Sequence, residues 1–177
     1  PSWNLAAKTW CAIRSCKKLF WPMKPGETTV NITNEQDQHS LNPDGLREVA
    51  VLVSTEAFPA GRRVQIDLVF VDDQSMAALN ETHLGHDGPT DIITFDYSTP
   101  TLLHGELVIC PQVAAIHARK FDNSLGEELA RYVIHGVLHL LGHDDHDPDD
   151  QSKMKAEEDR LLDRLRRQLD FNGLTHE

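Results

Sequence analysis

The chain has 177 residues, which is long enough for one domain with a single hydrophobic core. Hydrophobic residues make up 40 % and charged residues 25 %, and no apolar run approaches the roughly 20 residues that cross a bilayer, so the composition is that of a soluble globular protein. The formal net charge of −11 argues against a protein that coats nucleic acid through a basic surface, although a nuclease with a local cationic pocket stays open.

Residues 1–22 differ in composition from the rest of the chain. They carry four basic side chains, no acidic one and all three tryptophans, and they lack the 7–15-residue apolar run of a secretory signal. We interpret them as an extension that starts before the native protein, with a targeting peptide as the alternative, and we place the domain at residues 23–177 from Met23. This domain then has a net charge of −15. The three cysteines, Cys11, Cys16 and Cys110, form no zinc or disulfide pattern, which indicates free thiols in a reducing compartment.

From residue 28 onward the hydrophobic pattern predicts four strands and five helices. Strands are expected where β-branched or alternating apolar residues gather, at 28–33, 63–71, 90–97 and 105–110. Helices are expected where apolar residues recur with helical spacing, at 42–58, 72–84, 111–122, 124–142 and 150–169. We therefore expect one α+β domain in which a small mixed four-stranded sheet packs with about five helices.

The helix expected at 124–142 carries a candidate metal site. It opens with Ser124 and Glu127 in capping-box spacing and closes with Gly142. His135 and His139 are four residues apart, so their imidazoles project from one face, the arrangement by which a helix supplies two ligands to one zinc ion.

After Gly142 the chain can turn back and offer a third ligand, either Asp145 or His146. The pattern H-x-x-x-H-x-x-G-x-x-D supplies three ligands and leaves the fourth position open, as in catalytic zinc sites. Two histidines at this spacing also occur by chance, and for most aspartates of the acidic loop at 144–150 we favour a solvated turn. Because Gly142 turns the chain sharply, we expect Asp145 to face the two histidines and His146 to point away.

The residue after the first histidine limits the chemistry. Zinc peptidases have Glu there as the general base, whereas this chain has Gly136, which cannot transfer a proton. A peptidase mechanism of that type loses its base, while metal-assisted cleavage of a phosphodiester stays open.

The stretch HGVLHLLGHDD (135–145) resembles the H-G-x-L-H-L-x-G-x-D-H signature of the YbeY family of bacterial endoribonucleases. Three further stretches are similar to family segments in the same order, LNETHLGHDGPTDIITFDY (79–97), GELVICP (105–111) and EELARYVIHG (127–136). The resemblance runs from about residue 28 to 169 and leaves residues 1–22 uncovered.

The resemblance implies one zinc ion per chain, which we assign to His135, His139 and Asp145. It also implies a cytoplasmic endoribonuclease, specific for single strands, that acts in maturation of the 3′ end of 16S ribosomal RNA and in ribosome quality control. The expected partners are ribosomal RNA and the small ribosomal subunit, with neither DNA nor a membrane.

The chain departs from the family pattern at several positions. The family usually has His where this chain has Asp145, and we keep Asp145 rather than His146 as the third ligand because aspartate also binds zinc. The family commonly has Arg at the position of Leu84, and the loss of that arginine puts the phosphate contacts in doubt.

Smaller departures are His86 and Gly88 where basic residues are common, and Glu106 where Asp is usual. Arg131, one turn before His135, is the nearest cation that could replace the lost arginine, although a plain surface role is the interpretation we favour.

Two alternative functions stay open at this point. One is a zinc hydrolase of peptides or small molecules, which Gly136 disfavours. The other is a ribosome-biogenesis factor that is not catalytic and whose metal is structural. The strong negative charge of the domain favours this alternative more than the charge of a basic relative would.

Overall fold

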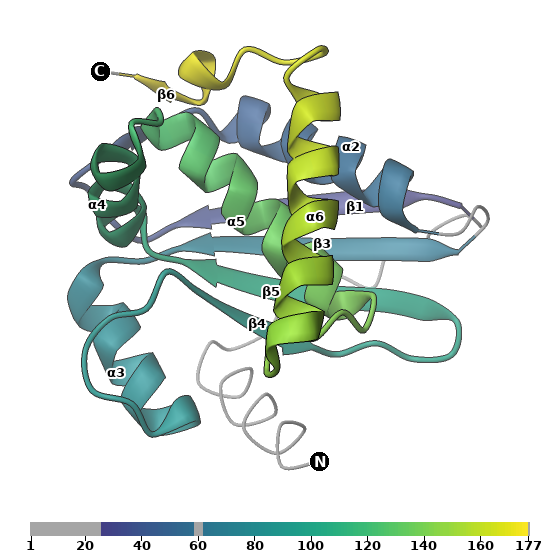
Figure 1. Ribbon diagram of the computed structural model, residues 1–177, viewed down its shortest axis with the longest axis horizontal. Coiled ribbons are helices and arrows are strands. Elements are labelled where there is room, and N and C mark those ends of the chain that lie inside the picture. The colour runs from purple at the N-terminus through teal and green to yellow at the C-terminus, as the bar shows by residue number, and fades with distance from the viewer. Residues whose placement is uncertain (1–25, 59–61, 177) are drawn as a thin grey trace.

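The computed structural model describes residues 26–58 and 62–176 (Figure 1). Residues 1–22, and with them the domain boundary expected at Met23, lie outside the described residues. Of the three cysteines, Cys110 is described, and it is buried with a free thiol. Over the described ranges, none of the helices has the length and apolar character needed to span a bilayer.

Four strands form a mixed sheet, as predicted. They are β1 (Thr28–Asn34), β3 (Arg63–Phe70), β4 (Ile92–Asp96) and β5 (Leu102–Ile109), in the order β1-β3-β5-β4. β1, β3 and β5 run parallel, and β4 pairs with β5 in the antiparallel sense. β5 begins earlier than predicted because its pairing with β3 already starts at Arg63 opposite Leu102.

The helices also follow the prediction closely. They are α2 (Pro43–Ala57), α3 (Asp73–Leu84), α4 (Pro111–Phe121), α5 (Leu125–Leu140) and α6 (Pro148–Leu165). The structure thus confirms a single α+β domain with five α-helices in its described part. α6 starts two residues earlier than predicted because Asp147 caps it, accepting hydrogen bonds from the N–H groups of Asp149 and Asp150.

Short elements close the C-terminal end of the described chain. A 3-10 helix, η1 (Phe171–Leu174), precedes β6 (Thr175–His176), which pairs with β2 (Ser40–Leu41). η1 packs against the start of α5, where a Cβ on Gly126 would collide with the carbonyl oxygen of Phe171.

The sheet separates two apolar clusters, because successive strand residues point to opposite faces. α2, α5 and α6 cover one face of the sheet (Figure 1), where Leu68 and Leu107 belong to the larger cluster. On the other face, Met76 of α3 packs with Val69 and Val108.

α5 lies unusually close to β5 because two glycines remove side chains from their interface. A Cβ on Gly136 would lie 2.6 Å from Cδ2 of Leu107, and one on Gly105 would collide with the side chain of Leu140. The close approach fixes α5, and therefore its two histidines, on a rigid sheet. It also shows that position 136 faces the core, so that a side chain there would point into the sheet.

Candidate metal centre

α5 ends in a Schellman turn at Gly142. The N–H of His143 donates to the carbonyl oxygen of Leu138 at 3.1 Å, and the N–H of Gly142 donates to that of His139 at 2.9 Å. Gly142 has φ +90°, a backbone conformation that favours glycine. The predicted helix end is therefore confirmed, and the chain reverses there toward the last turns of α5.

This reversal brings Asp145 beside the two histidines of α5. The Nε2 atoms of His135 and His139 are 3.0 Å apart, and Oδ2 of Asp145 lies 3.9 Å from each of them. One point lies roughly 2.1 Å from all three atoms, which matches the Zn–N and Zn–O distances of about 2.0–2.2 Å. Two imidazole nitrogens and a carboxylate oxygen are also ligands that zinc accepts, so the geometry and the donor set fit a divalent ion.

Each imidazole is held from the side that faces away from this cluster. Nδ1 of His135 lies 2.6 Å from Oε1 of Glu158, and Nδ1 of His139 lies 3.1 Å from the carbonyl oxygen of His143. Both partners are acceptors, so a proton on each Nδ1 leaves the Nε2 lone pairs directed toward Asp145. Without a metal, a proton between the two Nε2 atoms holds them in hydrogen-bond contact, and a bound cation takes the place of this proton.

Glu158 was missed by the sequence analysis. It comes from α6, and its side chain is only 12 % exposed. Its second oxygen, Oε2, lies 3.8 Å from Nη1 of Arg131, which in turn donates to Oδ1 of Asp159 at 2.9 Å. Arg131 therefore joins two carboxylates of α6 at its place one turn before His135.

The two histidines have pKa values shifted in opposite directions. Burial lowers the pKa of His135, but the hydrogen bond and the charge of Glu158, helped by Asp91 and Asp145, raise this pKa by more, so that it ends above its ordinary value. Burial and the neighbouring His135 lower the pKa of His139. His139 is therefore held in the neutral form that binds metal, whereas binding at His135 displaces a more tightly held proton.

The remaining polar residues of the loop point elsewhere. His146 contacts Asp144 through Nδ1, and its side chain is 76 % exposed. Oδ1 of Asp144 also accepts hydrogen bonds from the N–H groups of Asp145 and His146, at 2.8 and 3.2 Å. Of the two alternatives for the third ligand, the fold thus brings Asp145 to the histidine pair, and the assignment of ligands stays a prediction.

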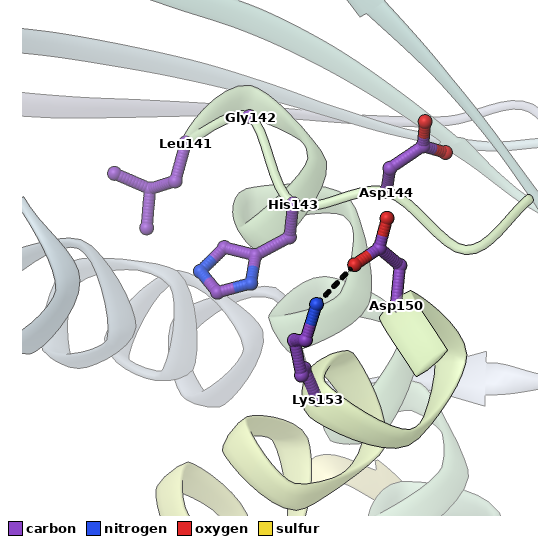
Figure 2. A pocket seen from close by; sticks show the side chains of 6 residues that line it. All are labelled: Leu141, Gly142, His143, Asp144, Asp150 and Lys153. Atoms are coloured by element: carbon purple, nitrogen blue, oxygen red, sulfur yellow. Dashed lines mark hydrogen bonds and ion pairs between the residues drawn. The ribbon is translucent and has the colours of Figure 1, made fainter. Parts of the chain in front are cut away.

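A surface hollow of about 210 Å³ lies next to the cluster, on the other side of the Schellman turn. Figure 2 shows that the imidazole of His143 turns toward Lys153, while the carboxylate of Asp144 lies on the opposite side of the backbone. Lys153 is itself bound to Asp150 at 2.6 Å. His143 therefore contributes its backbone carbonyl to the candidate centre and its side chain to this hollow.

Leu84 and Gly88, two positions at which the sequence departs from the family pattern, make local contacts of their own. Leu84 ends α3 and packs against the apolar cluster around Met76. Gly88 has φ +85°, and its carbonyl oxygen accepts a hydrogen bond from Nδ2 of Asn80 at 2.8 Å. Leu84 therefore has a structural role at the end of α3, and Gly88 has one in the loop that follows.

The sequence profile of the family described as Endoribonuclease YbeY matches residues 31–166, which include the whole candidate centre. The chain belongs to the YbeY family. A relative from Chlorobium phaeovibrioides, named Endoribonuclease YbeY, is 37 % identical over 134 residues, which cover 76 % of this chain and 88 % of the relative. A relative from Mycobacterium ulcerans with the same name is 37 % identical over 130 residues, covering 63 % of this chain and 72 % of the relative.

A solved structure is similar as well. The solution structure of TM1509 from Thermotoga maritima has a TM-score of 0.53 and 26 % sequence identity, and the match covers 76 % of this chain and 87 % of that one. These findings confirm the YbeY resemblance and place the chain among endoribonucleases, enzymes that act on RNA.

Proposed function

We propose that this YbeY protein is a zinc-dependent endoribonuclease, specific for single strands, in which His135, His139 and Asp145 hold one zinc ion per chain. We further propose that it acts in the cytoplasm with the small ribosomal subunit, in maturation of the 3′ end of 16S ribosomal RNA and in ribosome quality control. The observation that carries the zinc proposal is the convergence of three ligand atoms whose imidazoles are anchored through Nδ1.

A divalent ion held there supplies Lewis-acid chemistry, because it polarises a phosphoryl oxygen and increases the acidity of water. The protein's own residues orient the site. Glu158 and the carbonyl of His143 fix the two imidazoles, and the side chains of the three proposed ligands, 26 %, 27 % and 41 % exposed, leave one side of the cluster open to an RNA phosphate.

The geometry disfavours hydrolysis of peptides. A side chain at position 136 would point toward Leu107 and Ile92 in the core, so this position cannot hold a base beside the cluster. A purely structural zinc is also disfavoured, since such sites are closed by four protein ligands. In residues 26–58 and 62–176, no fourth His, Cys, Asp or Glu joins the three.

Metal content and cleavage, measured on the same purified full chain, test the proposal. We expect one zinc per chain, single-turnover cleavage of an RNA carrying the 3′ end of 16S ribosomal RNA, loss of cleavage with a chelator, and recovery when zinc is returned. H146A is the matched control for H135A, because it removes a histidine near the cluster that does not face it. Zinc-loaded protein that binds this RNA without cutting it would instead favour the non-catalytic alternative, and cleavage of peptides would favour the hydrolase.

A further inference from the structure

α4 differs in charge from every other α-helix of the described chain. Its sequence PQVAAIHARKF has no Asp or Glu, whereas each of the other described α-helices carries at least one. The surrounding domain is strongly acidic, with a net charge of −15 over residues 23–177. A polyanion that approaches this protein meets repulsion over most of its surface, so an acid-free helix is a place where it can settle.

The cations of α4 are also unneutralised. Arg119 and Lys120 are exposed near its C-terminus, and within the described ranges neither forms an ion pair with a carboxylate. Most other described cations are bound to carboxylates, as in the pairs formed by Arg47, Arg131, Lys153, Lys155, Arg160, Arg164 and Arg166. Arg119 and Lys120 are therefore available to phosphate groups.

Large apolar side chains stand beside these cations. Ile116 is 61 % and Phe121 is 59 % exposed, and they are the exposed large hydrophobic residues of the described chain. Nζ of Lys120 lies 5.1 Å from the centre of the Phe121 ring. Cations that bind the backbone, next to an aromatic ring on which a base can stack, are the combination by which proteins hold single-stranded nucleic acid.

α4 lies beside the same stripe of α5 that carries the candidate metal centre. Nδ1 of His117 is hydrogen-bonded to the hydroxyl group of Tyr132 at 2.7 Å. Tyr132, His135 and His139 follow one another at helical spacing along this stripe. Phe121 ends α4 four residues before the first residue of α5, so this end of α4 lies near the start of α5. Because α5 rises about 1.5 Å per residue, its first residue lies roughly 20 Å from His139, which about six stacked nucleotides span at 3.4 Å each.

We propose that the outer face of α4, formed by Ile116, Arg119, Lys120 and Phe121, is a second contact surface for single-stranded RNA, about six nucleotides along the strand from the metal centre. The proposal rests on the proposed function, since it extends the path of the same substrate. The unneutralised cations favour RNA over a protein partner as the occupant of this face. A protein partner would need only the apolar side chains.

Binding without cleavage tests the cations. The probe is a fluorescent 2′-O-methyl RNA of 16 nucleotides, titrated with the full chain at several salt concentrations. Each phosphate contact contributes about 0.7 to the slope of log affinity against log salt for single strands, so R119Q/K120Q should bind more weakly and flatten the slope by about 1.4. The matched control R160Q/R164Q changes the net charge equally at α6 cations bound to Glu157 and Glu56, and it should keep the parent slope.

Phe121 distinguishes stacking from general apolar contact. F121L keeps an apolar side chain without the aromatic face, and it should weaken binding of the 16-nucleotide probe about 5- to 150-fold, whereas F121W should retain binding. If F121L binds RNA like the parent, the ring does not stack, and a protein-binding role for this face is favoured. All these changes lie on an exposed surface, and unchanged melting temperatures show that the fold is kept.

Substrate length separates this surface from the metal centre. Cleavage of a 16-nucleotide RNA should slow in R119Q/K120Q, while cleavage of a four-nucleotide RNA should not, because four nucleotides span only about 14 Å and cannot reach from the metal centre to the C-terminal end of α4. If the parent binds the 16-nucleotide RNA but cuts neither RNA, the proposed function fails while the binding result still stands. A parent-like affinity and salt slope in R119Q/K120Q, or a parent that does not bind the probe, overturns the proposal.

Discussion

Replacing Glu158 with glutamine tests how far α6 sets the position of His135. The carboxylate of Glu158 lies 2.6 Å from Nδ1 of His135 and is 12 % exposed, so the hydrogen bond is short and mostly shielded from water. Glutamine keeps the shape and one accepting oxygen but loses the charge. Leucine keeps the approximate volume but accepts no hydrogen bond, and it leaves Nδ1 without this partner.

The expected magnitude follows from these contacts. Loss of a partner that orients a metal-binding histidine weakens metal binding by about 10- to 100-fold, and we expect E158Q near the lower limit and E158L near the upper one. Zinc titration against a competing chromophoric chelator measures the affinity. D159N is the matched control, because Asp159 also binds Arg131 but contacts neither histidine. A parent-like zinc affinity in E158L, or an equal loss in D159N, would refute the reasoning.

The same pair predicts a pH dependence in the metal-free protein. Although burial lowers the pKa of His135, Glu158 raises it by more, so that it exceeds the ordinary value of 6.5 and the protonated form is favoured in the folded state. This stabilisation is complete below pH 6.5 and is lost as the pH rises through the raised pKa. In melting experiments with chelator, the advantage of the parent over E158Q should therefore shrink from pH 6 to pH 9.

The remaining predictions concern the ligands and the packing of α5. H135A and H139A should each lose stoichiometric zinc and activity, because two ligands hold the ion poorly, and metal analysis checks this. D145N should weaken zinc binding strongly, whereas H146A should leave it nearly intact and D145H should keep metal bound. The opposite pattern for D145N and H146A would show that His146 is the third ligand instead of Asp145. G136E should fail to fold stably instead of gaining peptidase activity, because its carboxylate would be buried against apolar side chains of β5, and denaturant unfolding measures the loss.

The sequence predicted the sheet and the five helices well because each is long enough to show its own period. Three short elements were missed, η1 of four residues and β2 and β6 of two residues each, for which no period can be read. The pairing of β2 with β6 depends on a contact between Leu41 and Thr175, which are far apart in sequence. The end of α6 was placed four residues late because its charged pattern continues past Leu165.

Within the candidate centre, the predictable part is local. His135, His139 and Gly142 lie within eight residues, and helix geometry together with the glycine turn is enough to bring them close to Asp145. Glu158 lies 23 residues after His135, on another helix, and only the packing of α6 against α5 brings the two together. No spacing rule links them, which is why the partner that orients His135 emerged only from the fold.

Gly142 ends α5 and also positions residues of the candidate centre. Gly85 ends another helix in the same way, so a comparison of the two glycines separates the effect on stability from the effect on the centre. Gly85 ends α3 with φ +70°, Gly142 ends α5 with φ +90°, and a Cβ at either position meets no atom within 4 Å. Alanine should therefore cost each turn about 1–2 kcal/mol of backbone strain without a clash. The turn at Gly142 also places the carbonyl of His143 against Nδ1 of His139 and returns Asp145 to the cluster. G142A and G85A should thus lower the melting temperature to a similar extent, but only G142A should weaken zinc binding. Equal zinc affinity in the two variants would mean that Asp145 and His139 keep their positions without this turn.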